Sequence, residues 1–137
     1  MAIGHFLKKQ DFSPDSLHKK LGVDGEALAA QYLQTKGFKV LVRNYRSRVG
    51  EIDLIIEKSG VIHFVEVKSR RRSDAVSPRE LIPYSKQKKI SKTAQEYLAK
   101  FKKEGSAVFS ALLIDWAESE TPKIEWIENA FELAYGY

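Results

Sequence analysis

The sequence predicts an α/β fold in which a mixed β-sheet is flanked by helices, in the order α-β-β-β-α-β-β. Two segments repeat their apolar residues at the interval of a helix that is buried on one face. Five shorter segments are rich in β-branched and aromatic residues, as strands are, and turn residues separate most of them.

The first helix is expected over residues 17–36. A serine, a proline and an aspartate at 13–15 form a helix-start signal, because a capping residue precedes a proline at the first helical position. Gly22 and Gly25 could divide the helix in two, since glycine weakens helix interiors, and Gly37 is expected to cap its end.

Five strands are expected, at residues 38–46, 50–57, 61–68, 107–117 and 123–131. Ser59 and Gly60 separate the second strand from the third and suit the two-residue turn of a β-hairpin. A polar loop with two prolines follows the third strand, and a short turn or helix is expected after the fifth.

The second helix is expected over residues 85–103, with a buried face formed by Ile90, Ala94, Tyr97, Leu98 and Phe101. Trp116 and Trp126 are expected to pack in the core. His63 is expected there as well, because strand alternation places it on the face opposite Glu66.

The chain has 137 residues, and we expect a flexible lead-in at 1–16 and a single domain at 17–137. It has no cysteine, which excludes disulfides and thiolate metal sites and fits a reducing compartment. No apolar run is long enough to span a membrane, and the first residues lack the apolar core of a signal peptide. A cytoplasmic protein with no membrane partner is therefore expected.

The net charge of +5 is unevenly distributed along the chain. Residues 36–103 carry 18 Lys and Arg against 7 Asp and Glu, whereas residues 104–137 carry one Lys against 7 acids. A basic middle and an acidic tail indicate that one surface meets a polyanion. A lysine-rich solvated surface would have the same composition.

Two acids, Asp53 and Glu66, lie in the most apolar part of the chain, where an uncompensated carboxylate is costly. A two-residue turn at 59–60 sets a register that places Asp53 directly opposite Glu66, and Glu51 opposite Lys68, on one face. The residues expected on the other face of the second strand are Ile52, Leu54 and Ile56.

Opposed side chains in such a hairpin have Cβ atoms about 5 Å apart, so two carboxylates there need a shared proton or a cation. Lys68 supplies one positive charge, and a hard divalent ion such as Mg²⁺ or Mn²⁺ would supply more. The hairpin therefore predicts a divalent-cation site.

This layout resembles the PD-(D/E)xK nuclease motif, with Asp53 on one strand and Glu66-Val67-Lys68 on the next, although Ile52 replaces the motif's proline. The blocks "NYRSRVGEIDLII" and "VIHFVEVKSRR", with "GE" in the first helix, look like the YraN family of bacterial endonuclease-like proteins, which are similar to Holliday-junction resolvases. The similarity covers about residues 21–92 and a block near the end, "IEWIENAF".

The resemblance implies a restriction-endonuclease-like fold. It also implies that Asp53 and Glu66 are metal ligands, with the Val67 carbonyl as a third oxygen. Lys68 would orient the attacking water and stabilise charge on the phosphate. The family's next strand often carries an acid after its phenylalanine, but this chain has Ser110 there, which puts a contribution from that strand in doubt.

Two further acids have two interpretations each. Glu26 matches the extra acid that many such nucleases bring to the metal, but it also fits a first-turn glutamate favoured by the helix dipole. Glu51 could ligate the metal or form an ion pair with Lys68.

Basic residues frame the expected site, and arginine suits phosphate because its planar fork donates two hydrogen bonds. The expected nucleic-acid ligands are Arg43, Arg46, Arg48, Arg70, Arg71 and Lys86. Gln87 corresponds to a polar helix residue that some relatives aim at the site. The alternative for each of these residues is a solvated surface.

Together these inferences predict a metal-dependent endonuclease that acts on nucleic acid, with DNA favoured over RNA and with branched DNA as a candidate substrate. A homodimer would suit a junction, because two cuts need two sites. Two alternatives stay open: a non-catalytic nucleic-acid-binding module on the same fold, and a protein-interaction domain.

Overall fold

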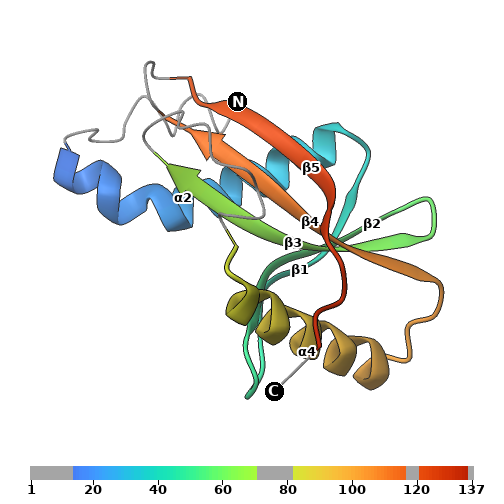
Figure 1. Ribbon diagram of the computed structural model, residues 1–137. Coiled ribbons are helices and arrows are strands. Elements are labelled where there is room, and N and C mark those ends of the chain that lie inside the picture. The colour runs from blue at the N-terminus through green and yellow to red at the C-terminus, as the bar shows by residue number, and fades with distance from the viewer. Residues whose placement is uncertain (1–13, 71–81, 117–120, 136–137) are drawn as a thin grey trace.

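The computed structural model describes residues 14–70, 82–116 and 121–135, with side chains described from residue 25 onward. These ranges contain two helices and five strands in the predicted order. The elements are α2 (Pro14–Thr35), β1 (Lys39–Arg46), β2 (Glu51–Lys58), β3 (Val61–Arg70), α4 (Tyr84–Lys100), β4 (Ser106–Asp115) and β5 (Lys123–Phe131). The predicted α/β fold, a mixed sheet flanked by helices, is confirmed (Figure 1).

The five strands form one sheet in the order β1-β2-β3-β4-β5. Neighbouring strands are antiparallel except β3 and β4, which are parallel. A parallel pair needs a long crossover connection, and α4 lies in that connection. Because α2 and α4 cover opposite faces of the sheet (Figure 1), β2 and β3 lie between two helices.

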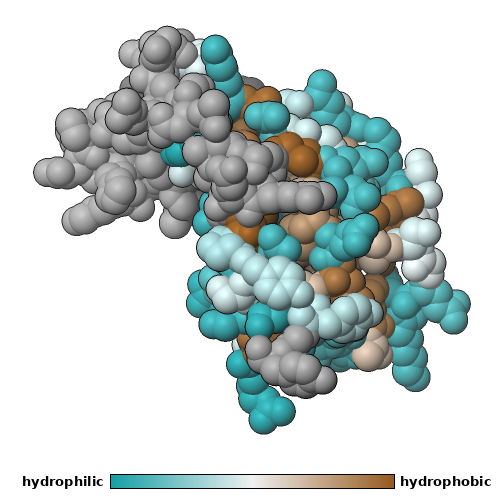
Figure 2. Space-filling model, in the orientation of Figure 1, coloured by the Kyte–Doolittle hydropathy of each residue, from teal (hydrophilic) through white to brown (hydrophobic). Residues whose placement is uncertain are grey.

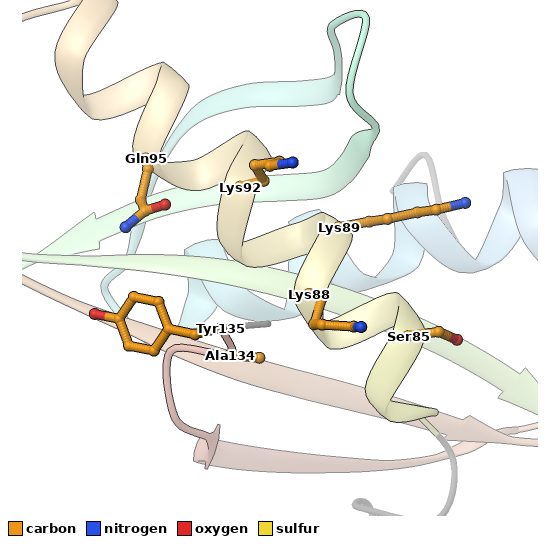
Figure 3. Close-up of a pocket in the computed structure, with 7 residues that line it drawn as sticks. All are labelled: Ser85, Lys88, Lys89, Lys92, Gln95, Ala134 and Tyr135. Carbon is orange, nitrogen blue, oxygen red and sulfur yellow. The ribbon is translucent and has the colours of Figure 1, made fainter. Parts of the chain in front are cut away.

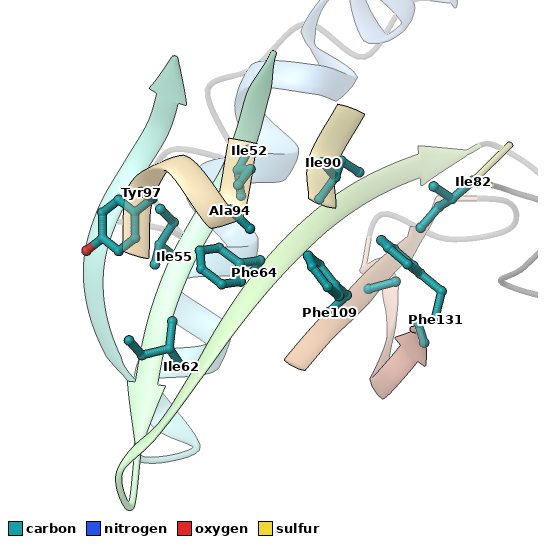
Figure 4. Close-up of a cluster of buried hydrophobic side chains, with 12 residues drawn as sticks. Ile52, Ile55, Ile62, Phe64, Ile82, Ile90, Ala94, Tyr97, Phe109 and Phe131 are labelled. Atoms are coloured by element: carbon teal, nitrogen blue, oxygen red, sulfur yellow. The ribbon is translucent and has the colours of Figure 1, made fainter. Parts of the chain in front are cut away.

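Two hydrophobic clusters hold the sheet, one under each helix. The α2 cluster includes Ala29, Ala30, Leu33, Leu54, Ile56, Val65 and Leu112. The α4 cluster includes Ile52, Ile55, Ile62, Phe64, Ile90, Ala94 and Tyr97 (Figure 4). Burial on both faces explains the continuous apolar runs of β2 and β3, which would otherwise alternate with polar residues.

The described surface outside these clusters is largely hydrophilic. On the face shown in Figure 2, hydrophilic side chains occupy much of the coloured area, and hydrophobic ones show between them. Within the described ranges, no helix combines the length and the apolar character needed to cross a membrane.

The first helix, α2, is continuous, so Gly22 and Gly25 do not divide it. Gly25 lies directly against β3, where an added Cβ would collide with Ser69 Oγ. This close approach of helix and strand explains a glycine inside a helix, despite its conformational cost. As predicted, the helix begins at a proline, and Gly37 follows its end with a φ of 92°.

The β2–β3 hairpin has the predicted register, since Lys58 pairs with Val61 and the pairing continues to Leu54 and Val65. Both turn residues have positive φ, 52° at Ser59 and 80° at Gly60. Two successive left-handed residues form the type I′ turn, whose twist matches that of the flanking strands. The turn therefore fixes which residues of β2 and β3 face each other.

Gly60→Ala is expected to destabilise the protein by about 1–2 kcal/mol, because an alanine at this φ brings its Cβ against its own carbonyl oxygen. Urea unfolding at equilibrium measures the change. Ser59→Asn is the control: asparagine favours the same turn, so its free energy of unfolding should equal or exceed that of the wild type. Equal stability of Gly60→Ala and wild type would contradict the turn assignment.

Side-chain alternation along β1 and β2 breaks where Asn44 lies opposite Asp53. Ile52 was predicted to share a face with Leu54 and Ile56, but it packs in the α4 cluster (Figure 4), whereas those two residues pack in the α2 cluster. Val42 and Tyr45 also both contact that cluster, although they are three residues apart. Asn44 has a φ of 54°, in the left-handed region, and this turn of the backbone explains why both strands change face here.

The prediction that Phe101 is buried is wrong: it is 48% exposed. The helix ends one residue earlier, so the ring lies at the edge of the core against Tyr97, with ring centroids 4.8 Å apart. His63 and Trp116 are buried as predicted, and Trp126 is partly buried against the α2 cluster.

Two expected loops lie largely outside the described residues, namely the lead-in at 1–16 and the polar loop after β3. After β5, residues 132–135 form no regular structure, so the short turn or helix expected there is not present at these positions.

Candidate active site

Asp53 lies at the point where β2 and β3 stop pairing, one residue beyond the Leu54–Val65 pair. Its Oδ2 atom accepts a hydrogen bond of 2.8 Å from the backbone N–H of Val67. A side chain thus takes a donor that strand pairing would otherwise use, and the carboxyl group is held between the two strands.

Glu66 lies on the face of β3 that carries Phe64 of the α4 cluster, and its side chain is only 5% exposed. Two ammonium groups contact it. Lys86 Nζ, from the first turn of α4, touches Glu66 Oε2 directly, and Lys68 Nζ lies 3.8 Å from the same oxygen. The buried charge is therefore compensated from two different elements.

Glu66 is close enough to affect the protonation of Asp53. Burial, and next the negative charge of Glu66, raise the pKa of the Asp53 carboxyl to about 7, although the hydrogen bond from Val67 acts in the opposite direction. A hydrogen bond between the two carboxyl groups also favours the protonated form. Asp53 therefore retains its proton up to about neutral pH.

Lys86 is held as a cation by this pair. Burial alone lowers the pKa of its ammonium group, but the hydrogen bond and the charge of Glu66 outweigh burial, and the pKa is raised. A cation in the first turn of a helix also opposes the helix dipole. Its position is thus explained by the acids that it faces.

Glu26 reaches the same region from α2. Burial raises the pKa of its carboxyl, against the charge of Arg43 and a hydrogen bond with the Asn44 side chain. Its interpretation as a first-turn glutamate is wrong, because α2 begins at Pro14, about three turns earlier. Its negative charge also contributes to the raised pKa of Asp53.

A family model for the description "Uncharacterised protein family UPF0102" matches residues 25–115. The chain belongs to family UPF0102. This is the YraN family that the sequence motifs indicated.

Several UPF0102 proteins are similar to this chain over most of both lengths. One from Geobacter metallireducens is 43% identical over 122 residues, 88% of this chain and 99% of that protein. One from Thermodesulfovibrio yellowstonii is 44% identical over 113 residues, 82% and 96% respectively. One from Persephonella marina is 42% identical over 114 residues, 83% and 95% respectively.

Asn44 is a residue of the site for which the sequence predicted no role. Its side chain bonds Glu26, and its left-handed backbone turns β1 opposite Asp53. Asparagine suits both tasks, because it tolerates the left-handed region and carries an amide. The signal in the sequence was an asparagine inside an otherwise β-branched and aromatic strand.

The structure pairs Glu51 with Arg46 rather than with Lys68. Arg46 Nε lies 3.5 Å from Glu51 Oε2, and both side chains are more than half exposed. The two residues are register partners at the end of the β1–β2 pair. An exposed ion pair of this kind contributes little stability. Because both side chains are exposed, both charged groups are accessible to ligands.

A basic cleft of about 350 Å³ lies between the β1–β2 connection and α4. Its lining residues are Arg46, Ser47, Arg48, Val49, Gly50, Glu51, Lys86, Lys89 and Ile90. Lys86 joins this cleft to the carboxyl pair, because its ammonium group contacts Glu66. Arg43 and Arg48 are both exposed, and their predicted contact with nucleic acid stays a prediction.

Two other predicted residues, Arg70 and Gln87, do not point into this cleft. Arg70 faces Asp115, with Nε 4.0 Å from Oδ2, and its side chain is 23% exposed. Gln87 donates from Nε2 to the carbonyl of Ile82 at 2.9 Å, so its amide holds the segment before α4. Arg71 lies outside the described residues.

Ser110 follows Phe109 on β4, at the position for which the sequence left a contribution to the site in doubt. It is fully buried, its Oγ atom is hydrogen-bonded to Nδ1 of His63 at 3.1 Å, and it accepts a bond from the backbone N–H of Asn129. This serine therefore joins three strands in the core.

Proposed function

We propose that the chain is a divalent-metal-dependent endonuclease that hydrolyses phosphodiester bonds in nucleic acid, with DNA favoured over RNA. The observation that carries the proposal is the buried Asp53–Glu66 carboxyl pair, contacted by Lys86 and approached by Lys68. Perturbed carboxyl groups that meet lysines beside a basic cleft are typical of functional sites.

The residues fit a hard divalent ion such as Mg²⁺ or Mn²⁺. Two carboxyl groups that hold a proton between them can exchange it for a cation, and carboxylate oxygens are the ligands that Mg²⁺ prefers. Asp53, Glu66 and the Val67 carbonyl would hold the ion. When bound, such an ion activates water and neutralises charge that develops on a phosphate.

The chain's own residues supply the other requirements. Lys68 is about one-third exposed and lies beside Glu66, where it could orient a water and donate to a phosphate oxygen. Glu26 stays close enough to influence the charge of Asp53. The basic cleft with Arg46, Arg48 and Lys89 offsets the repulsion between the acids and a polyanion.

The proposal predicts that Mg²⁺ or Mn²⁺ binds saturably in isothermal titration and that Asp53→Asn/Glu66→Gln abolishes the binding. Glu125→Gln/Glu128→Gln is the matched control, because it removes two exposed carboxylates from β5. Metal-dependent cleavage of junctions, flaps and linear strands would be screened with the same three proteins. The proposal would be overturned if neither metal bound the wild-type protein and none of these substrates was cleaved.

One observation favours the alternative of a non-catalytic nucleic-acid-binding module. Two lysines already compensate Glu66, and within the described ranges no three acid or histidine side chains are grouped as a metal site. In that case oligonucleotides would bind with a steep salt dependence, and neither metal would promote cleavage.

A further inference from the structure

The outer face of α4 carries a second basic cavity, which we call the α4 groove. It encloses about 440 Å³ between α4 and the segment after β5. Its lining residues are Ser85, Lys88, Lys89, Lys92, Gln95, Ala134 and Tyr135 (Figure 3). Among these lining residues none is acidic, so the groove favours an anionic occupant.

The lysines of the groove come from successive turns of one helix. Lys88 and Lys92 are four residues apart and therefore share a face of α4. Lys89 lines both this groove and the basic cleft beside the carboxyl pair. A continuous basic path thus leads from Lys86, at Glu66, over α4 into the groove.

An exposed aromatic ring borders the lysines. Tyr135 is 69% exposed, and the neighbouring Tyr84 is 56% exposed. Lys88 Nζ lies 5.6 Å from the centre of the Tyr84 ring. Sites that bind single-stranded nucleic acid combine exposed aromatic rings, on which bases stack, with lysines or arginines, which bind the phosphates.

The segment that carries Tyr135 is anchored to α4. The Tyr84 hydroxyl donates to the carbonyl of Tyr135 at 2.7 Å, and the backbone N–H of Ala134 donates to Ser91 Oγ at 2.9 Å, in a buried position. The ring therefore sits on a fixed backbone, which lowers the entropy cost of stacking a base on it.

We propose that the α4 groove binds an unpaired nucleic-acid strand, with phosphates on Lys88, Lys89 and Lys92 and a base stacked on Tyr135. A duplex hides its base faces, so the exposed ring selects a single strand. Strand binding by the groove depends only on the residues that line it. A role in cleavage rests on the proposed function: the groove would then hold a single-stranded arm of the substrate.

The test measures binding of labelled oligothymidine, oligouridine and a duplex in EDTA. Tyr135→Ala is expected to weaken single-strand binding roughly five- to 100-fold, as loss of one stacked base does. Lys88→Gln/Lys92→Gln should make the plot of log association constant against log salt concentration less steep, by about 1.4 in the slope. Lys102→Gln/Lys103→Gln, which removes two exposed lysines beyond the end of α4, should leave both quantities unchanged.

Three results would overturn the inference: unchanged affinity in both groove variants, equal losses in the lysine control, or polyglutamate binding as tightly as the oligonucleotides. Circular dichroism melts of each variant exclude unfolding as the cause of any loss. The Asp53→Asn/Glu66→Gln protein separates the two proposals, because it should lose metal binding and still bind oligothymidine. A stronger effect on oligothymidine or on oligouridine assigns the strand as DNA or RNA.

Discussion

Replacing Lys68 with alanine is expected to lower the rate of phosphodiester cleavage by a factor on the order of 10²–10³. The ammonium group lies 3.8 Å from Glu66 Oε2, and its side chain is about one-third exposed. Charge that develops on the phosphate in the transition state would lose its nearest cationic donor from β3. Since this contact strengthens only during the reaction, substrate affinity should change far less than rate.

Single-turnover cleavage, with binding measured separately in Ca²⁺ or EDTA, distinguishes these effects. Lys123→Ala is the matched control, because it removes an exposed lysine from β5 and should cleave at the wild-type rate. Lys68→Arg keeps the charge but changes its geometry, and partial activity is expected. If Lys68→Ala instead weakened binding and left the single-turnover rate intact, Lys68 would be a phosphate ligand without a catalytic role.

The register of the β2–β3 hairpin was predictable because local chemistry determines it. Ser59 and Gly60 specify a type I′ turn, and a strand period of two then assigns every residue to a face. Asp53 and Glu66 could therefore be brought together from the sequence alone, and the effect of Glu66 on the pKa of Asp53 in the structure agrees with that prediction.

The face of Ile52 was not predictable by the same rule. Strict alternation fails where Asn44 adopts a left-handed conformation, because a strand period of two assumes extended backbone at every residue. The side chain of Asn44 also contacts Glu26, so a strand and a distant helix meet at this position. Local rules cannot see such a contact.

The partners of Glu66 depend on tertiary packing as well. Lys86 was expected to be a nucleic-acid ligand, and its contact with Glu66 arises only because α4 packs across β3. The exposure of Phe101 also depends on where packing ends. Phe101 continues the helical period of the buried face, but the helix ends one residue before it. Periodicity predicts which face is apolar, but not where packing stops.

Asp53→Asn is expected to stabilise the metal-free protein at pH 8 by roughly 2–4 kcal/mol, discounted for partial exposure and for sharing of the proton with Glu66. The wild-type carboxyl is penalised when ionised, because it is buried beside another carboxylate. Asparagine has the same shape and no charge. It can still accept the hydrogen bond from Val67 and can donate to Glu66.

The pH dependence gives this prediction its sign. The pKa of Asp53 is about 7 in the folded protein, above the ordinary value of 3.8 that applies to the unfolded chain. Well below pH 3.8 the carboxyl is protonated in both states and carries no penalty, and near pH 4, where about half of the unfolded chains have released the proton, the penalty is still small. As pH rises toward 7, the unfolded chain releases its proton first, so wild-type stability falls, and above pH 7 the deficit relative to Asp53→Asn is constant.

Urea unfolding of both proteins in EDTA, from pH 4 to pH 8, measures the difference. The two stabilities should be similar at pH 4 and separate with rising pH, whereas Glu125→Gln/Glu128→Gln should run parallel to the wild type. Parallel curves for Asp53→Asn would mean that Asp53 ionises normally and that the carboxyl pair stores no unfavourable charge. A gain in stability on removing the charge would instead mark Asp53 as a residue whose presence costs the fold free energy, which a cation-binding role would explain.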